Sequence, residues 1–125
     1  MRLNPDCIRD ILLVAEENTG YREEWTLSRD KSLPEQLQKY DFKTVAYHAN
    51  QCIMAGLLVE GHRFLGVEVA IKDLTPEGHE FLANIRAETN WNKVKQKAKV
   101  IGSESLSVLI QLAGQIITAT LAQGH

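Results

Sequence analysis

The stretch DFKTVAYHANQCIMAGLLVEGHRFLGVEVAIKDL, residues 41–74, decides the expected fold. Asp41 suits the N-cap of a helix that we expect to run to about Ala55, because its carboxylate can accept from the first free backbone N–H groups. After this helix, apolar and polar side chains alternate with the period of a half-buried strand. The stretch therefore predicts a helix followed by a β-hairpin with strands at about 57–63 and 67–74.

The helix expected over residues 41–55 has two faces of different character. Its apolar side chains recur at helical spacing and are expected to face the core; they are Phe42, Val45, Ala46, Ala49, Cys52 and Ile53. The opposite face carries side chains that can bond to bases or phosphates, namely Lys43, Thr44, Tyr47, His48 and Gln51. We interpret this face as a candidate DNA-binding surface; the alternatives are a solvated helix face and a surface for a partner protein.

Three elements are expected before this stretch. Asn4 and Pro5 are typical of a helix start, and the spacing of apolar residues after them predicts a helix over 4–18. A short strand is expected at about 25–27. Ser32 or Leu33 is then expected to open a short helix that has Pro34 at its start.

Two helices are expected after the hairpin. Thr75-Pro76 is a strong helix start, because it combines a capping hydroxyl with a proline at the first helical position. No strong breaker follows before Val100, so we expect this helix to continue past Trp91. Ser103 or Ser105 is then expected to cap a last helix.

Charge divides the 125 residues into three parts. Residues 1–90 hold 10 basic and 15 acidic side chains, residues 91–102 hold four lysines and no acid, and residues 103–125 hold one acid. We therefore expect a globular domain over 1–90, a basic helical connector over 91–102 and an apolar C-terminal helix over 103–125. The overall net charge of -2 excludes a strongly basic, histone-like DNA binder.

The two cysteines, Cys7 and Cys52, are too few for a disulfide scaffold. Charged residues interrupt the N-terminal segment, so we expect no signal peptide and a reducing, cytoplasmic setting. Cys52 falls on the inward face of its helix and is expected to be buried and unreactive.

The expected order of helix, short helix, helix, hairpin and helix is that of a winged helix-turn-helix domain. Residues 47–58, YHANQCIMAGLL, resemble the recognition-helix end of such proteins, and residues 74–82, LTPEGHEFL, resemble the start of the helix after the wing. The resemblance implies an α+β, mostly helical fold whose helix at about 42–55 enters a major groove. His62 and Arg63, at the wing tip, either contact the DNA backbone or form a polar turn.

A closer resemblance covers residues 1–100. It rests on four groups of residues: NPDCIRDIL at 4–12, Tyr47-His48 with Ala55-Gly56-Leu57-Leu58, Leu74-Thr75 with GHEFL at 78–82 and Ile85-Arg86, and Trp91-Asn92-Lys93 with Lys95. These groups are similar to a family of short bacterial and prophage proteins that is catalogued as a domain of unknown function. The resemblance supports the fold and implies no activity.

The tail carries an apolar stripe that is expected to join two chains: Leu106, Leu109, Ile110, Ala113, Ile116 and Ile117. Large aliphatic side chains left in water forgo about 1.5–3 kcal/mol each, so the stripe needs a covering surface. A two-fold partner is the commonest solution. Packing on the helix at 4–18 is the alternative, and a membrane span is disfavoured because polar residues interrupt the apolar run.

The sequence predicts no metal site, cofactor or catalytic group. His48 and Cys52 have an i, i+4 spacing that can hold a metal, but no third ligand accompanies them at matching spacing. The resemblances and the apolar tail together lead us to expect a homodimeric winged-helix protein that binds double-stranded DNA. Such a protein would be a small bacterial or prophage transcriptional regulator. The alternative is a non-catalytic interaction module whose winged-helix face docks a host or phage protein.

Overall fold

The computed structural model describes residues 1–123, so Gly124 and His125, which belong to the expected C-terminal helix, lie outside the described residues. The fold is α+β and mostly helical, as expected. Its elements in chain order are α1 (Pro5–Asn18), β1 (Trp25–Leu27), the 3₁₀ turn η1 (Glu35–Leu37), α2 (Phe42–Met54), β2 (Leu58–Glu60), β3 (Val69–Leu74), α3 (Pro76–Ile85), α4 (Glu88–Ile101) and α5 (Leu106–Gln123).

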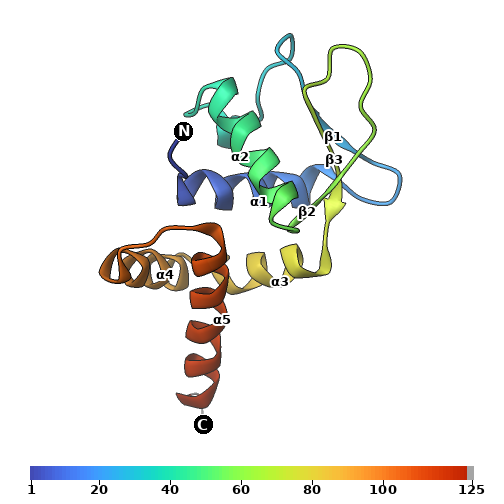
Figure 1. Cartoon of the computed structure of the whole chain (residues 1–125). Helices are drawn as coiled ribbons and strands as arrows, with labels where there is room; N and C mark the ends of the chain where they lie inside the picture. Colours follow the sequence, from blue (N-terminus) through green and yellow to red (C-terminus); the bar gives the residue numbers. More distant parts are fainter. Residues whose placement is uncertain (124–125) are drawn as a thin grey trace.

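Helix α1 lies in the middle of the molecule, with α2 on one side of it and α3 and α4 on the other (Figure 1). The three strands form an antiparallel sheet in the order β1-β3-β2 at one end of α1. Leu58 pairs with Leu74 and Trp25 pairs with Ile71, so β3 is the central strand. This pairing confirms both the short strand at 25–27 and the expected hairpin.

Four of the expected helix starts are confirmed by a side-chain capping hydrogen bond, whereas η1, which follows Pro34, has no such bond. The Asn4 side chain accepts from the N–H groups of Asp6 and Cys7 at 3.0 and 3.3 Å. The Asp41 carboxylate accepts from an N–H of α2 at 2.7 Å, and the Thr75 hydroxyl accepts from an N–H of α3 at 2.9 Å. For the last helix, the structure selects Ser105 over Ser103, because the Ser105 hydroxyl accepts from the backbone of α5 at 3.3 Å.

The start of α3 is fastened directly to the end of α2. The Thr75 hydroxyl donates to the carbonyl of Gly56 at 2.6 Å, and its backbone N–H donates to the carbonyl of Leu57 at 3.0 Å. Gly78 lies so close to Leu57 that a Cβ there would collide with the Leu57 carbonyl oxygen. The glycine of the LTPEG segment is therefore required by this close approach.

The expectation of one continuous helix from Pro76 past Trp91 is wrong. Helix α3 ends at Ile85, the chain is extended at Ala87, and α4 begins at Glu88. The guanidinium of Arg9 in α1 donates to the carbonyls of Ile85 and Arg86 at 3.0 and 2.6 Å. Arg9 thereby satisfies carbonyl groups at the end of α3, which would otherwise need the backbone of a continuing helix.

The break lets α4 pack against the start of α1. The Trp91 indole N–H donates to the Asp6 carboxylate at 2.8 Å, and the Lys95 ammonium bonds to the same oxygen at 2.9 Å. Trp91, Val94 and Ala98 are buried in one core with α1. Residues 91–102 thus differ from the expected connector, because most of them form a helix that is part of the core.

The carboxylate of Asp6 stabilises the docked position of α4 in a pH-dependent way. Burial by itself raises its pKa, but the hydrogen bonds from Lys95 and Trp91 outweigh this and lower the pKa of Asp6 below its ordinary value. A lowered carboxyl pKa contributes stability above the unfolded value of about 3.9, and that contribution disappears as the pH falls through the folded value.

We expect Asp6→Asn to lower the free energy of unfolding by about 1 kcal/mol at pH 7, since the side chain is half exposed and solvent screens the pair. Urea unfolding followed by the fluorescence of the two buried tryptophans, Trp25 and Trp91, measures this loss, with Asp30→Asn as an exposed control that changes nothing. The difference between wild type and Asp6→Asn should shrink below about pH 4. A difference of equal size at pH 2.5 and pH 7 would show that the charge is not responsible.

Candidate nucleic-acid interface

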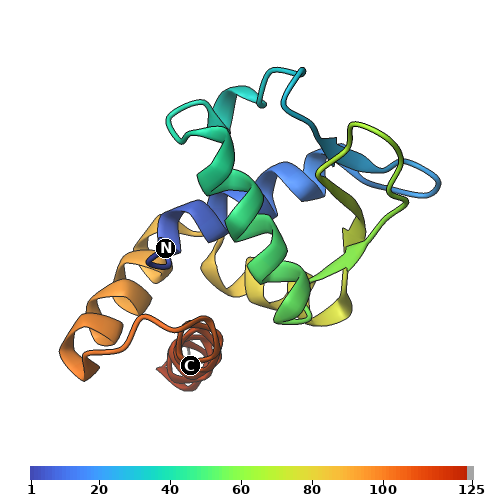
Figure 2. The same cartoon turned by 45° about the horizontal axis from the view of Figure 1, so that its top comes forward.

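Helix α2 crosses α1 with one side in the core and the other side facing outward (Figure 2). The predicted apolar face of this helix does point into the core, since three of its residues are fully buried: Val45, Ala49 and Cys52. Gly56, with a φ of +79°, turns the chain after α2, and the N–H of Leu57 then bonds back to Cys52 at 2.9 Å. The inward side is therefore fixed at both ends of the helix, and the outward side is the candidate interface.

The prediction that His48 lies on the outward face is wrong, because only 1% of this residue is exposed. Its Nε2 atom accepts from the backbone N–H of Asn4 at 2.8 Å, and its Nδ1 atom lies 2.8 Å from the carbonyl of Thr44. A carbonyl can only accept, so Nδ1 carries the proton and donates to Thr44. His48 is thus a neutral structural group that joins α1 to α2.

The other four residues expected on this face are accessible to different degrees. Lys43 is exposed, whereas Thr44 and Gln51 are half-buried. Tyr47 is also half-buried, and its hydroxyl donates to the carbonyl of Met1 at 3.4 Å. The N-terminal segment therefore lies alongside α2 and occupies part of the face that the sequence suggested for bases.

Two exposed residues of α2 were missed by the sequence analysis. Asn50 and Met54 are exposed and extend a stripe that begins at Lys43 and passes Tyr47. These positions follow one another at i, i+4, i+7 and i+11, which places them on one side of a helix. The helical spacing of these four residues can be seen in the sequence. The exposure of Met54 cannot, because an apolar side chain near a helix end is ordinarily expected to be buried.

The hairpin loop, residues 61–68, carries the second predicted group. Glu24 accepts from the backbone N–H and the Nδ1 atom of His62, both at 2.8 Å, and these bonds lower the pKa of the Glu24 carboxyl. Arg63 donates to the carbonyl of Glu68 at 2.7 Å. Both predicted side chains are exposed, and both are already bonded to protein groups.

The tip of this loop is apolar, which the sequence analysis did not notice. Phe64 is 64% exposed and Leu65 is fully exposed. The loop also comes close to β1, because a Cβ on Gly61 would collide with the carboxylate of Glu24. The loop is therefore tied at its base to the residues around β1 and presents two exposed apolar side chains, together with Arg63.

The outward side of α2 is free of acidic groups in an otherwise acidic body. Residues 42–54 contain no Asp or Glu, whereas residues 1–90 contain 15. The nearest acid in sequence is the cap Asp41, whose carboxylate is bonded to the backbone of Thr44. Among the described residues, Lys43 has no ion-pair partner. The helix itself therefore presents no negative side chain that would repel an anionic partner.

The apolar stripe of α5 is covered mainly by its own chain. Helix α5 packs against α3 and α4. Four of the residues expected at a dimer interface are buried there, namely Leu106, Leu109, Ala113 and Ile116. Only Ile110 and Ile117 remain half-buried, and Leu112, which the analysis missed, is also buried. The break after α3 explains this difference, because it turns α4 so that α3 and α4 together offer an apolar surface.

Both cysteines are buried, and the expected burial of Cys52 is confirmed. Burial raises the pKa of the Cys7 thiol to about 12 and raises the pKa of Cys52 as well. Within residues 1–123, no group of three His, Cys, Asp or Glu side chains is arranged to hold a metal ion. In the same residues, no helix is both long enough and apolar enough to cross a membrane.

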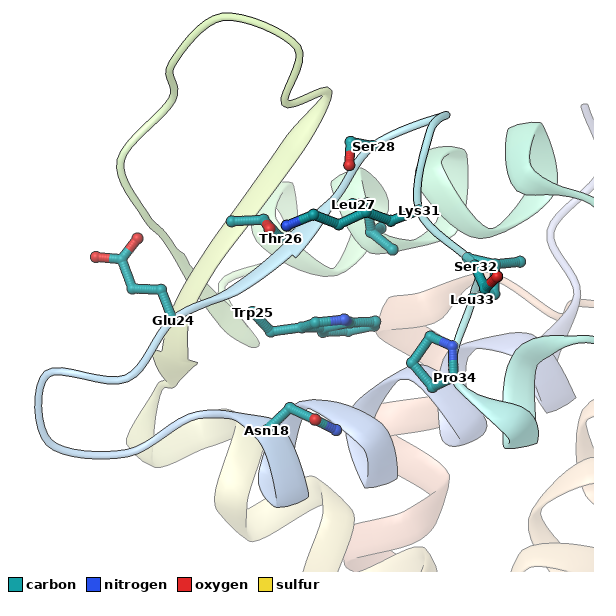
Figure 3. A pocket seen from close by; sticks show the side chains of 10 residues that line it. All are labelled: Asn18, Glu24, Trp25, Thr26, Leu27, Ser28, Lys31, Ser32, Leu33 and Pro34. Atoms are coloured by element: carbon teal, nitrogen blue, oxygen red, sulfur yellow. The ribbon is translucent and has the colours of Figure 1, made fainter.

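A hollow of about 270 Å³ lies between β1 and the segment that leads to η1 (Figure 3). The hydroxyl groups of Thr26, Ser28 and Ser32 line it together with Lys31. Trp25 also lines the hollow, but this residue is only 7% exposed. Its ring is therefore a wall of the fold and offers a ligand little surface for stacking.

We expect His48→Ala to lower the free energy of unfolding by about 2–4 kcal/mol, because it leaves a cavity and an unpaired buried N–H at Asn4. Asn50→Ala, on the exposed side of the same helix, should change it by less than about 0.5 kcal/mol. Urea unfolding at pH 7 compares the two. If His48→Ala is as stable as Asn50→Ala, the structural role of His48 is refuted.

Comparison with known proteins places this chain in a family. Residues 2–104 match the family described as "Hypothetical protein (DUF2513)". An uncharacterized protein of Haemophilus influenzae is 33% identical over 125 residues, which cover 98% of this chain and all of the relative. No solved structure matches. The family match confirms the resemblance to a domain of unknown function, and the chain belongs to the DUF2513 family.

Proposed function

We propose that the chain is a winged-helix protein that binds double-stranded DNA as a transcriptional regulator. In this proposal α2 is the recognition helix and the hairpin loop 61–68 is the wing. The observation that carries the proposal is that α2, which contains no acidic side chain, packs against β2 and β3, the two strands of the hairpin. A recognition helix followed by a wing gives DNA contacts in the major groove and on the flanking backbone.

The dimensions of α2 support this role. Its 13 residues span about 20 Å at 1.5 Å each, and a helix with its side chains is about 10–12 Å wide, as is the major groove. Lys43 lies in the first turn, which is the part of a recognition helix that approaches base edges. Asn50 and Gln51 carry side-chain amides, and one such amide can form two hydrogen bonds with the edge of an adenine.

The charge distribution limits the affinity that this surface can supply. Phosphate contacts normally provide much of the binding free energy, and each neutralised phosphate contributes a slope of about -0.9 to log K against log salt. The described surface offers Lys43, Arg63 and His62, and the last two already have protein partners. We therefore propose that one chain binds weakly and that two linked chains bind a symmetric site.

A homodimer through the outward side of α5 would provide this linkage. Residues 106–123 contain no charged side chain, although a helix at a protein surface usually carries charges on its solvent side. The second half of α5 projects beyond the body (Figure 1), and Leu121 is 70% exposed. Ile117 and Leu121 lie on one side at i, i+4 spacing. They are the proposed contact with the second chain, in place of the buried part of the stripe.

A second candidate function is docking of a partner protein, and the exposed Phe64 and Leu65 favour it. Apolar side chains at a loop tip provide the kind of anchor that fills a pocket on another protein. This candidate uses the loop without needing Lys43 or the amides of α2. The salt dependence of binding and the position of sensitive residues therefore separate the two functions.

We expect the chain to bind random duplex DNA at low salt, with an affinity that falls steeply as salt increases. Lys43→Ala should weaken this binding and make the salt slope shallower by about 0.9 for each chain bound, because one phosphate contact is lost. Lys99→Ala, on α4, is the matched control and should leave the slope unchanged. Fluorescence anisotropy with a labelled duplex measures both. Absence of binding at 20–50 mM salt would contradict DNA binding and favour the docking function.

We expect the wild type to sediment as a dimer at micromolar concentration and Ile117→Asp with Leu121→Asp to sediment as a monomer. Two buried carboxylates in an apolar contact carry a desolvation cost that abolishes association. Gln115→Asp with Ala119→Asp adds the same charge to exposed positions on the opposite side of α5 and serves as the control. A wild type that remains monomeric at high micromolar concentration would refute the dimer.

A further inference from the structure

A groove of about 590 Å³ lies between α4 and α5, outside the surfaces discussed so far. Figure 2 looks along α5 and shows α4 beside it, joined by the short turn after Ile101. Leu112 and Ile116 of α5 form the apolar floor, and Val100 and Ile101 of α4 form an apolar lip. The volume is within the range of small-ligand pockets, which is about 300–1,000 Å³.

The apolar lip of this groove is unusually open. Val100 is 84% exposed and Ile101 is 60% exposed, although they are adjacent to the buried floor residues. Exposed apolar surface beside an apolar floor indicates a site that is completed by another molecule. None of these residues belongs to α2 or to the hairpin loop, so the groove is separate from the proposed DNA contact.

The rim of the groove is positively charged. Lys93 and Lys97 line it from one side of α4, since they are four residues apart. Residues 89–103 contain four lysines and no acid. Lys95 is paired with Asp6, and Lys99 lines a different hollow. Within residues 1–123, neither Lys93 nor Lys97 has an ion-pair partner.

We propose that this groove binds a single-chain anionic amphiphile, a medium-chain carboxylate. The alkyl chain lies on Leu112 and Ile116 under the lip of α4, and the carboxylate bonds to the ammonium groups of Lys93 and Lys97. From Lys93 to Ile101 the axis of α4 rises about 12 Å, which suits an alkyl chain of medium length. The positive charges of Lys93 and Lys97 favour an anionic head group, and the apolar floor favours an alkyl chain.

The proposal is tested by calorimetric titration of the full chain with decanoate at low salt, below the concentration at which decanoate forms micelles. Decanoate is expected to bind, and decanol and decyltrimethylammonium are expected to bind at least tenfold more weakly, because they lack the anion. Octanoate is expected to bind about sixteenfold more weakly, since each buried methylene changes affinity about fourfold.

Variants separate the groove from general electrostatic attraction. Lys93→Glu with Lys97→Glu is expected to weaken decanoate binding at least tenfold. Lys95 is avoided, because it contacts Asp6. Lys99→Glu with Lys72→Glu makes the same change in charge outside the groove and is expected to weaken binding less than twofold. Circular dichroism and urea unfolding confirm that both double variants are folded as the wild type is.

Several results would overturn the proposal. Equal losses in the two double variants would mean that decanoate senses only net charge, and equal binding of decanol would mean that the lysines are not used. Binding to vesicles of phosphatidylglycerol without binding of free decanoate would assign the groove to a lipid surface. A dimer that Lys93→Glu with Lys97→Glu dissociates, without decanoate binding, would assign the groove to a second copy of the chain.

Discussion

The contact between Asn4 and His48 is the constraint on which the candidate interface depends. The Asn4 side chain caps α1, while its backbone N–H donates to His48 in α2. One residue thus fixes the start of the first helix and the rotation of the second. With His48 held inward, the stripe from Lys43 to Met54 must face outward. The surface offered to a partner is therefore a consequence of how the two helices are joined.

Side-chain contacts from α1 also hold the basic helix α4 against the acidic part of the chain. Asp6 accepts hydrogen bonds from Trp91 and Lys95, and the Arg9 guanidinium donates hydrogen bonds to the carbonyls at the end of α3. Two neighbouring turns of α1 thus determine where α3 ends and where α4 lies. The helix pair α3 and α4 then covers much of the apolar stripe of α5. Lysines that look alike in the sequence consequently have different environments: Lys95 is paired with Asp6, whereas the other three lysines of α4 have no ion-pair partner within residues 1–123.

Local chemistry made most of the fold predictable. Asn4, Asp41 and Thr75 each cap a helix as their side chains suggested, and the alternation before Leu74 gave the central strand. The break between α3 and α4 was not predictable, because Arg9 is 76 residues away from Ile85 in sequence and no Gly or Pro marks the place. Gly78 belongs to the LTPEG segment, and only the structure shows why a glycine is needed there: the Leu57 carbonyl leaves no room for a Cβ.

The candidate site was less predictable than the fold. A histidine among Lys, Thr and Gln in a helix suggests a polar face, and helical periodicity cannot show that a backbone N–H from another segment satisfies it. Burial of His48 therefore depends on the position of Asn4, which only the tertiary structure reveals. Helical spacing places Asn50 on the same side as Lys43, but spacing alone does not distinguish a surface residue from one covered by a neighbouring element. The same is true of Phe64 at the loop tip, whose exposure only the structure shows.

Mapping of backbone amide shifts by NMR during titration with a short DNA duplex tests the central claim most directly. The account predicts that shifts concentrate on the outward side of α2, at Lys43, Asn50 and Gln51, and on the hairpin loop 61–68. Amides of Val45, Ala49 and Cys52, on the buried side, should move less. Shifts confined to the lysines of α4, with α2 unchanged, would contradict the assignment of α2 as the DNA-binding element.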